Sequence, residues 1–239
     1  MKDKFDAAAF DVDGTLYPNY RFYIRLLPFL PLDWPLIASF GLARSAIRKH
    51  QKKIYESPSA DEKPPKQDFY RIQSEIMARI LKKDAETVYN QAQSRIYRRW
   101  ESIFKKVELY EGVKQTIKKI RENGKKTAVL SDFPLGLKLN NLGLDGLWDA
   151  EICSEEEGML KPAPLSFLEL VKRLDSPPER ILFVGNSLKY DVGGAKNAGM
   201  KAALITSDPF LKSKAKAAGD KKPDFIFSSY RQLEAFVLG

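Results

Sequence analysis

The stretch that most constrains the fold runs from Ala7 to Tyr17 and reads AAAFDVDGTLY. A short apolar segment ends at Asp11, a second carboxylate follows at Asp13, and Gly14 permits a tight turn. Two carboxylates that lie two residues apart in an extended chain project to the same face. Such a pair suits a nucleophile beside a general acid or base, or two ligands for a hard cation such as Mg²⁺. On local grounds alone, a strand that ends in a turn with turn-forming carboxylates is an equal alternative.

The composition is that of a soluble globular protein with room for one large domain or two small ones. Of the 239 residues, 44% are hydrophobic and 30% are charged. The single cysteine, Cys153, excludes an internal disulfide and gives no metal-binding pattern. No apolar run follows the first lysines, and the apolar zone at residues 22–43 is interrupted by Arg25, Asp33 and prolines. We therefore expect no signal peptide, no membrane span and a cytoplasmic location.

The positive charge is concentrated in one segment. The whole chain has a net charge of +9. Residues 21–106 contain 18 Lys and Arg against 9 Asp and Glu, whereas the remaining residues contain 22 of each kind. A basic segment beside a neutral body attracts anions, whether a phosphate ester, a nucleic acid or a membrane surface. Solvated, lysine-rich helix faces are the alternative explanation.

The basic segment is predicted to be helical, and the rest of the chain to alternate between helices and strands. From residue 107 onward, short apolar runs are separated by helical patterns, which is typical of an α/β fold. The expected helices of the basic segment are Trp34–Ile54, Asp68–Lys83 and Ala85–Phe104, with a loop at Ser57–Pro65. The expected later strands are Thr127–Leu130, Ala150–Cys153, Ile181–Val184, Lys201–Ile205 and Asp224–Phe227. The expected later helices are Glu111–Glu122, Pro164–Leu174, Asp191–Ala198 and Arg231–Leu238.

The sequence DVDGTLY resembles motif I, DxDGT, of the haloacid dehalogenase (HAD) superfamily, whose members are mostly Mg²⁺-dependent phosphohydrolases. The resemblance implies an α/β fold with a Rossmann-like parallel sheet and an α-helical cap inserted after motif I. Residues 1–20 and 107–239 would then form the core domain, and residues 21–106 the cap domain.

Three later stretches match the remaining motifs of this superfamily in order. Ser131 stands at motif II, and Lys161, within MLKPAP, matches the lysine of motif III. Taken singly, Ser131 also suits a helix cap and Lys161 a surface loop. The stretch FVGNSLKYD resembles motif IV, with Asp191 at the position of a metal-binding carboxylate. Asn186 stands where an aspartate is usual, which removes one negative charge from the metal site.

The resemblance implies a phosphatase that hydrolyses a small phosphate monoester through an aspartyl-phosphate. Asp11 would be the nucleophile, Asp13 the acid and base, and Lys161 the cation that neutralises the phosphoryl charge. The substrate-binding residues would be Thr15, Ser131, Asp132 and Lys161, and the Mg²⁺ ligands would be Asp11, Asp13, Asp191 and Asn186. The only histidine, His50, lies in the basic segment far from these motifs and is not expected to take part in catalysis.

Alternative functions remain open. A haloacid dehalogenase shares the nucleophile and the lysine but uses no metal and lacks the second aspartate of motif I, whereas a phosphomutase keeps both aspartates. A third alternative is a non-catalytic protein that binds anions or a membrane surface, because the apolar stretch Tyr20–Phe40 adjoins Arg44, Arg48, Lys49, Lys52 and Lys53. A cap helix that buries its apolar face is the simpler explanation of that stretch. The expected partner is a small phosphorylated metabolite, and nucleic acid is not expected, because no known nucleic-acid-binding module accompanies the basic runs.

Overall fold

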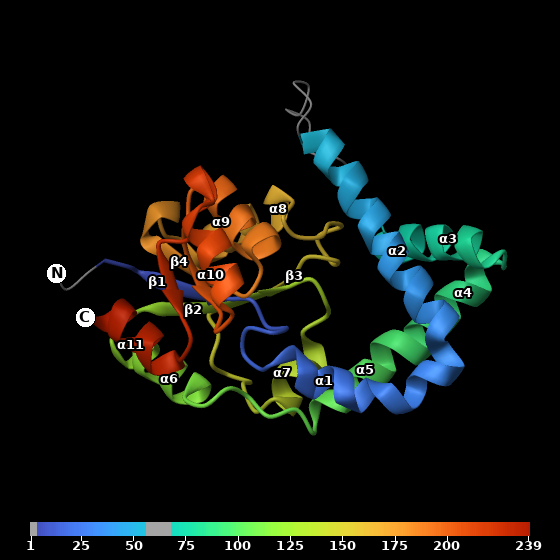
Figure 1. The fold of residues 1–239 in the computed structure, drawn as a ribbon, viewed down its shortest axis with the longest axis horizontal. Helices are drawn as coiled ribbons and strands as arrows, with labels where there is room; N and C mark the ends of the chain where they lie inside the picture. The colour runs from blue at the N-terminus through green and yellow to red at the C-terminus, as the bar shows by residue number, and fades with distance from the viewer. Residues whose placement is uncertain (1–3, 56–67) are drawn as a thin grey trace.

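The computed structural model describes residues 4–55 and 68–239 of the chain. Figure 1 shows a sheet between two layers of helices and, beside it, a second group of helices. The predicted loop at Ser57–Pro65 lies outside the described residues.

The sheet has six parallel strands in the order β3-β2-β1-β4-β5-β6. β1 lies in the middle, where Ala9 is opposite Ala128 of β2 on one side and Phe183 of β4 on the other. The strand order reverses at β1, and this is where open parallel sheets bind ligands. The predicted Rossmann-like parallel sheet is therefore confirmed. The strands are β1 (Ala7–Phe10), β2 (Lys126–Ser131), β3 (Ala150–Cys153), β4 (Ile181–Gly185), β5 (Lys201–Ile205) and β6 (Phe225–Phe227).

Both faces of the sheet are buried. Side chains alternate along β1, so Ala8 and Phe10 join one apolar cluster, whereas Ala7 and Ala9 join another on the opposite face. Figure 1 shows α8, α9 and α10 on one side of the sheet and α6 and α11 on the other. A sheet made only of parallel strands needs this double cover. The covering helices are α6 (Val113–Glu122), α8 (Pro164–Leu174), α9 (Gly193–Asn197), α10 (Pro209–Lys216) and α11 (Tyr230–Leu238).

The predicted core elements agree closely with the observed ones. β3, α8 and β5 have the predicted bounds, β2 is one residue longer at each end, and β4 and β6 differ from their predictions by one residue at one end. The helix predicted from Asp191 is observed as a π-helical turn, η4 (Leu188–Val192), that continues into α9. The prediction did not include α10, nor the elements α7 (Gly136–Asn141), η3 (Pro178–Arg180) and η5 (Gly219–Lys221).

The helices between β1 and α6 form the second group in Figure 1, which we call the cap. The helix predicted from Trp34 begins earlier, at Leu30, because Pro31 falls in the first turn, where no backbone N–H is needed. Asp68 caps the next helix by accepting the N–H groups of Tyr70 and Arg71. The cap consists of α1 (Asn19–Leu26), η1 (Leu27–Phe29), α2 (Leu30–Tyr55), α3 (Phe69–Leu81), α4 (Ala85–Ala92), η2 (Gln93–Tyr97) and α5 (Arg98–Phe104).

The cap has an apolar cluster of its own, which includes Phe40, Met77 and Ile96. Its base is built differently, because Phe22 of α1 and Phe104 of α5 belong to the same cluster as the core strands. The predicted domain boundary between residues 20 and 21 falls inside α1, because this helix begins at Asn19. The division into two domains remains a prediction.

The expectation for membrane spans needs correction on one point. The interruptions at residues 22–43 do not break the helical run Asn19–Ile54, which is long and apolar enough to cross a membrane by length and composition. Within its most apolar 18-residue window, 33% of the residues are buried in the protein. Core helices of soluble proteins and N-terminal signal sequences have the same length and composition, so this run alone is weak support for a membrane span.

Candidate active site

The predicted site residues meet at the carboxyl edge of the sheet. Asp11 directly follows β1, Ser131 is the last residue of β2, and Asn186 directly follows β4. Lys161 comes from the segment between β3 and α8, and Asp191 from η4. These strands are neighbours and parallel, so their carboxyl ends bring the side chains together.

Asp11, Lys161 and Asp191 form a buried charged cluster. The Lys161 Nζ lies 2.6 Å from Asp11 Oδ1 and 2.7 Å from Asp191 Oδ1. Thr15 Oγ1 donates a hydrogen bond of 2.6 Å to Asp11 Oδ2, so both oxygens of Asp11 are held. The side chain of Asp11 is thereby fixed in position at the end of β1. Thr15, predicted to bind the substrate, instead contacts the predicted nucleophile.

The protonation of this cluster follows from its burial. Burial, with the Asp191 carboxylate nearby, raises the pKa of Asp11 to about 7 against the opposing charge of Lys161. Burial alone would lower the pKa of Lys161, but the carboxylates of Asp11 and Asp191 raise it above its ordinary value. Lys161 is therefore an ammonium group in direct contact with Asp11, as neutralisation of an anion at this place requires.

Asp13 is held by three side chains. Its Oδ2 lies 2.5 Å from the Nζ of Lys138 and accepts a hydrogen bond of 3.2 Å from Ser131 Oγ. Its Oδ1 accepts a short hydrogen bond from the Tyr17 hydroxyl. Burial would raise the pKa of Asp13, but the charge and hydrogen bond of Lys138, with that of Tyr17, hold it below its ordinary value. Asp13 is therefore ionised at neutral pH.

Lys138 is a site residue that the sequence reasoning missed. It lies on α7, is 1% exposed and forms an ion pair with Asp13. The available signal is its position in the sequence, because Leu135 and Leu142 place Lys138 on the apolar face of a helix. A lysine at a buried helix position needs a partner of opposite charge.

Asn186 lies against the turn of motif I. Gly14 has a φ of +84°, and a Cβ at this position would lie 2.0 Å from Asn186 Nδ2. Only glycine fits there, for both reasons. On its other side, the backbone N–H groups of Asn186 and Ser187 donate hydrogen bonds of 3.1 and 2.9 Å to Asp191 Oδ2. The turn of motif I, Asn186 and Asp191 are thus packed together.

The site contains carboxylate and amide oxygens, the kind of donor that a hard cation prefers, but the side chain of Asp13 is directed away from the other predicted ligands. Asp11 and Asp191 converge on Lys161, and the side chain of Asn186 lies beside them against Gly14. The carboxylate of Asp13 is instead directed to Lys138 and Tyr17. Among residues 4–55 and 68–239, no three His, Cys, Asp or Glu side chains form a group that could hold a metal ion. Asp11, Asp191 and the amide oxygen of Asn186 are therefore the candidate ligands, without the Asp13 side chain.

Asp132 connects the site to the cap. Its Oδ1 accepts the backbone N–H of Lys161 at 2.8 Å, and its Oδ2 accepts a hydrogen bond of 2.7 Å from the Arg48 guanidinium. Arg48 also donates to the backbone carbonyl of Lys161 at 3.1 Å. Arg44, one helical turn earlier on α2, forms a buried ion pair with Glu155. Both oxygens of Asp132 are used within the protein, at the contact between core and cap, and its role in substrate binding stays a prediction.

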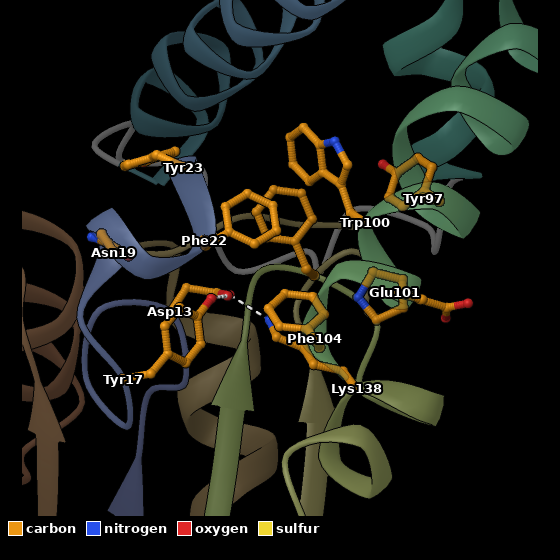
Figure 2. Close-up of a pocket in the computed structure, with 12 residues that line it drawn as sticks. Asp13, Tyr17, Asn19, Phe22, Tyr23, Tyr97, Trp100, Glu101, Phe104 and Lys138 are labelled. Carbon is orange, nitrogen blue, oxygen red and sulfur yellow. Dashed lines mark hydrogen bonds and ion pairs between the residues drawn. The ribbon is translucent and has the colours of Figure 1, made fainter. Parts of the chain in front are cut away.

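A cavity of about 170 Å³ lies beside Asp13, between the core and the cap. Figure 2 shows the rings of Phe22, Trp100 and Phe104 gathered near the Asp13–Lys138 pair. The lining residues are Asp13, Tyr17, Asn19, Phe22, Tyr23, Tyr97, Trp100, Glu101, Phe104, Phe133, Pro134 and Lys138.

Comparison with protein-family models gives one match over most of the chain. Residues 5–199 match the model of haloacid dehalogenase-like hydrolases. Among solved structures, a HAD phosphatase from Thermococcus onnurineus is similar, with a TM-score of 0.61 at 22% identity and 98% of both chains covered. A dehalogenase solved as an intermediate complex has a TM-score of 0.68 at 18% identity and covers 100% of both chains. At these identities the structures show a shared fold and nothing more.

The curated relatives include phosphatases. The ribulose-1,5-bisphosphate 5-phosphatase of Halopiger xanaduensis is 30% identical over 125 residues, which is 51% of this chain and 52% of the relative. The glyceraldehyde 3-phosphate phosphatase of Methanopyrus kandleri is 28% identical over an alignment of 244 positions that covers 95% of this chain and 94% of the relative. The match thus spans about half the length of the first relative and nearly all of the second.

Proposed function

This chain belongs to the haloacid dehalogenase-like hydrolases, and we propose that it is a phosphatase that hydrolyses a small phosphate monoester. The observation that carries the proposal is the arrangement around Asp11. Its carboxylate is fixed at the end of the central strand by Thr15 and Lys161, and Asp13 follows two residues later. A positioned carboxylate beside a cation and a second carboxylate meets the needs of phosphoryl transfer through a covalent intermediate.

In the first step, Asp11 attacks the phosphorus atom in line, and the bond from phosphorus to the alcohol oxygen breaks. The phosphoryl group is thereby transferred to Asp11. The Lys161 ammonium, in contact with Asp11, offsets the negative charge of the phosphoryl oxygens. Ser131 Oγ, which now donates to Asp13, is close enough to serve as a neutral donor to the same group.

The proton that the alcohol needs comes from Asp13. In the structure Asp13 is ionised, but a bound phosphate dianion is a like charge beside it and raises its pKa. Asp13 then takes up a proton when substrate binds and gives it to the leaving oxygen. The resulting carboxylate removes a proton from the water that attacks the aspartyl-phosphate. Inorganic phosphate is released, and the free carboxylate of Asp11 is regenerated.

We propose Mg²⁺ as the cofactor, held by Asp11, Asp191 and Asn186. When bound, it would supply positive charge to the phosphoryl oxygens. The family membership and the oxygen donors at the end of β1 and β4 support this assignment.

Two related activities use the same scaffold and are separated by their products. A mutase would return the phosphoryl group to a second hydroxyl, so free phosphate would not accumulate. A dehalogenase would release halide from a 2-haloacid, which has no phosphoryl charge for Lys161 to offset. The presence of Asp13 as an acid and base favours the phosphatase.

The test is hydrolysis of p-nitrophenyl phosphate by the purified chain, measured with Mg²⁺, with EDTA, and with the Asp11→Asn variant. We expect metal-dependent release of inorganic phosphate by the wild type and none in the other two reactions. Halide release from 2-chloropropionate is measured in parallel. Unchanged turnover by Asp11→Asn, or halide release in place of phosphate release, would overturn the proposal.

A second candidate function, contact of the cap with an anionic membrane surface, is favoured by one observation. Every fully exposed residue between positions 20 and 42 is uncharged. Further along α2, Lys49, Lys52 and Lys53 are exposed. An exposed apolar segment next to a basic one is typical of helices that lie on anionic lipid. The large exposed apolar residues of the segment are Tyr20, Tyr23, Ile24, Leu27, Leu32, Trp34 and Leu42.

A further inference from the structure

The cavity beside Asp13 lies where the alcohol part of a phosphate ester would be. If Asp13 protonates the leaving oxygen, as in the proposed function on which this inference rests, the alcohol must extend away from Asp13 on the side opposite Asp11. Asp13 and Lys138 form one end of the cavity, and the cap residues Tyr97 and Trp100 lie across from them. The chemistry of this cavity therefore selects the alcohol.

The walls of the cavity are predominantly aromatic. Phe22 stacks on Phe104 with ring centroids 5.3 Å apart, and Trp100 meets Phe22 edge to face at 5.4 Å. Trp100 also packs against Phe133 at 5.5 Å. These contacts fix the rings in place, so the wall is already formed without a ligand.

Several polar groups of the wall are already used within the protein. The Tyr17 hydroxyl donates to Asp13, and the Tyr97 hydroxyl accepts a hydrogen bond from Gln73. The Lys138 ammonium is paired with Asp13 and lies 4.9 Å from the centre of the Phe104 ring. The indole N–H of Trp100 is a buried donor without a partner among the described residues, and it could serve one ligand oxygen. A sugar or glycerol placed here would still lose most of the hydrogen bonds that its several hydroxyl groups make to water.

The volume limits the size of the group. An apolar cavity of about 150 Å³ in another protein accommodates a benzene molecule. The cavity of about 170 Å³ is therefore large enough for one ring or for a chain or branched group of similar size. Tyr23, at 57% exposure, stands at the opening toward solvent.

We propose that the substrate is a phosphate monoester of an apolar alcohol, with a single ring or a comparably small hydrocarbon group next to the phosphate. This class differs from ribulose 1,5-bisphosphate and glyceraldehyde 3-phosphate, after which the two curated relatives are named. Apolar contact supplies the binding free energy in the cavity, while the charged cluster binds the phosphate.

The test is a series of phosphate esters of primary alcohols, in which the leaving groups have similar acidity. We expect kcat/KM for benzyl phosphate to exceed that for glycerol 3-phosphate and ribose 5-phosphate by at least tenfold. From ethyl to hexyl phosphate, kcat/KM should rise about fourfold for each methylene group until the cavity is full. Equal or better hydrolysis of the two polar esters would overturn the inference.

A pair of variants on α1 tests whether the cavity causes the preference for benzyl phosphate. Tyr23 lines the cavity at 57% exposure, whereas Tyr20, at 58% exposure on the same helix, does not line it. Tyr23→Ser should reduce the preference for benzyl phosphate about threefold or more, and Tyr20→Ser should leave it unchanged. An equal effect of both variants would contradict a role for the cavity.

A binding measurement separates this inference from the proposed function. Calorimetry compares benzylphosphonate, which cannot be hydrolysed at its phosphorus–carbon bond, with methylphosphonate on the full chain. At least tenfold tighter binding of benzylphosphonate supports the apolar cavity, even if no ester is hydrolysed and the phosphatase proposal fails. Equal binding of the two overturns the inference, even if phosphatase activity is present.

Discussion

Lys138 keeps the carboxyl group of Asp13 ionised in the absence of substrate. A general acid must carry a proton, yet the ammonium of Lys138 holds the pKa of Asp13 below its ordinary value. Asp13 is consequently better suited to accept a proton from water than to donate one until a phosphate anion arrives. In the proposed mechanism, Asp13 of the free protein is thus ionised as the second step requires, and the charge of the bound phosphate raises its pKa for the first step.

Replacement of Lys138 by methionine should therefore raise the pKa of Asp13. Without the ammonium, the pH above which Asp13 is ionised and acts as a base also rises. We expect the pKa of Asp13 to move upward by about one to three pH units, which NMR titration of its carboxyl carbon measures, whereas the rise of kcat near pH 7 follows ionisation of Asp11. Because a buried ion pair is broken, urea unfolding should show a loss of about 3–5 kcal/mol. Lys114→Met, at an exposed position on α6, is the control, and an unshifted titration of Asp13 in Lys138→Met would contradict this role.

Some residues of this site can be predicted from the sequence, and others cannot. Asp11, Ser131 and Asn186 are placed by the ends of strands, and strand ends can be read from apolar runs followed by polar residues. Lys138 meets Asp13 only because α7 packs beneath the end of β1, across a separation of 125 residues. The residues around Asp13 and Lys138 contain no pattern that predicts their contact, so the pair can be seen only in the folded structure.

Among the elements, α9 shows how tight packing positions a site residue. Gly194 lies against α8, where an added Cβ would come within 2.3 Å of the Phe167 ring. The preceding turn, η4, carries Asp191. The absence of a side chain at Gly194 therefore lets the element that carries Asp191 approach the sheet closely.

Two glycine-to-alanine variants should have opposite effects on stability. Gly194→Ala forces a methyl group into the Phe167 ring and should lower the free energy of unfolding by about 1–3 kcal/mol. At Gly41, in the interior of α2, an added Cβ meets no atom within 4 Å among the described residues. Gly41→Ala should raise the free energy of unfolding by up to about 1 kcal/mol through helix propensity. Urea unfolding of both variants checks the pair, and equal stability of Gly194→Ala and wild type would contradict the packing explanation.

The elements that the sequence did not predict are short. α1, α7 and α10 contain 8, 6 and 8 residues, too few for a periodic apolar pattern to be distinct. The strands were predicted because a sheet covered on both faces needs continuous apolar runs, as in ILFVG of β4. The predicted helix Trp34–Ile54 misses the first four residues of α2, among them Pro31, which the first turn of a helix tolerates.

In the whole molecule, the cap exposes apolar side chains along residues 20–42 and lysines further along the same helical run. Figure 1 shows α2 on the cap, away from the sheet, whereas α1 lies next to the core, where its Phe22 and Leu26 are buried. An apolar surface of this kind is costly to leave in water, and the adjacent lysines attract anionic headgroups.

The cap should accordingly bind anionic vesicles. In sedimentation with vesicles of phosphatidylglycerol and phosphatidylcholine, we expect the chain to pellet at low salt, and less so with phosphatidylcholine alone. The Leu32→Ser/Trp34→Ser variant should bind at least tenfold more weakly, because two exposed apolar side chains are lost. Phe210→Ser, at 76% exposure on α10, is the control. No pelleting with anionic vesicles, or an equal loss in the control, would remove the membrane surface from consideration.

The contacts of Arg48 have a consequence for the timing of the reaction. Arg48, on the cap, binds both the Asp132 carboxylate and the backbone carbonyl of Lys161, on the core. The cap therefore cannot swing away from the core without breaking the hydrogen bonds of Arg48 to Asp132 and to the backbone of Lys161. Opening of the cap to admit substrate or release product therefore breaks the contacts of Arg48 beside Lys161, and reclosure restores them, while Lys161 stays bound to Asp11 and Asp191 within the core. In the proposed reaction, an aspartyl-phosphate formed while the cap is shut would be kept from acceptors other than the enclosed water.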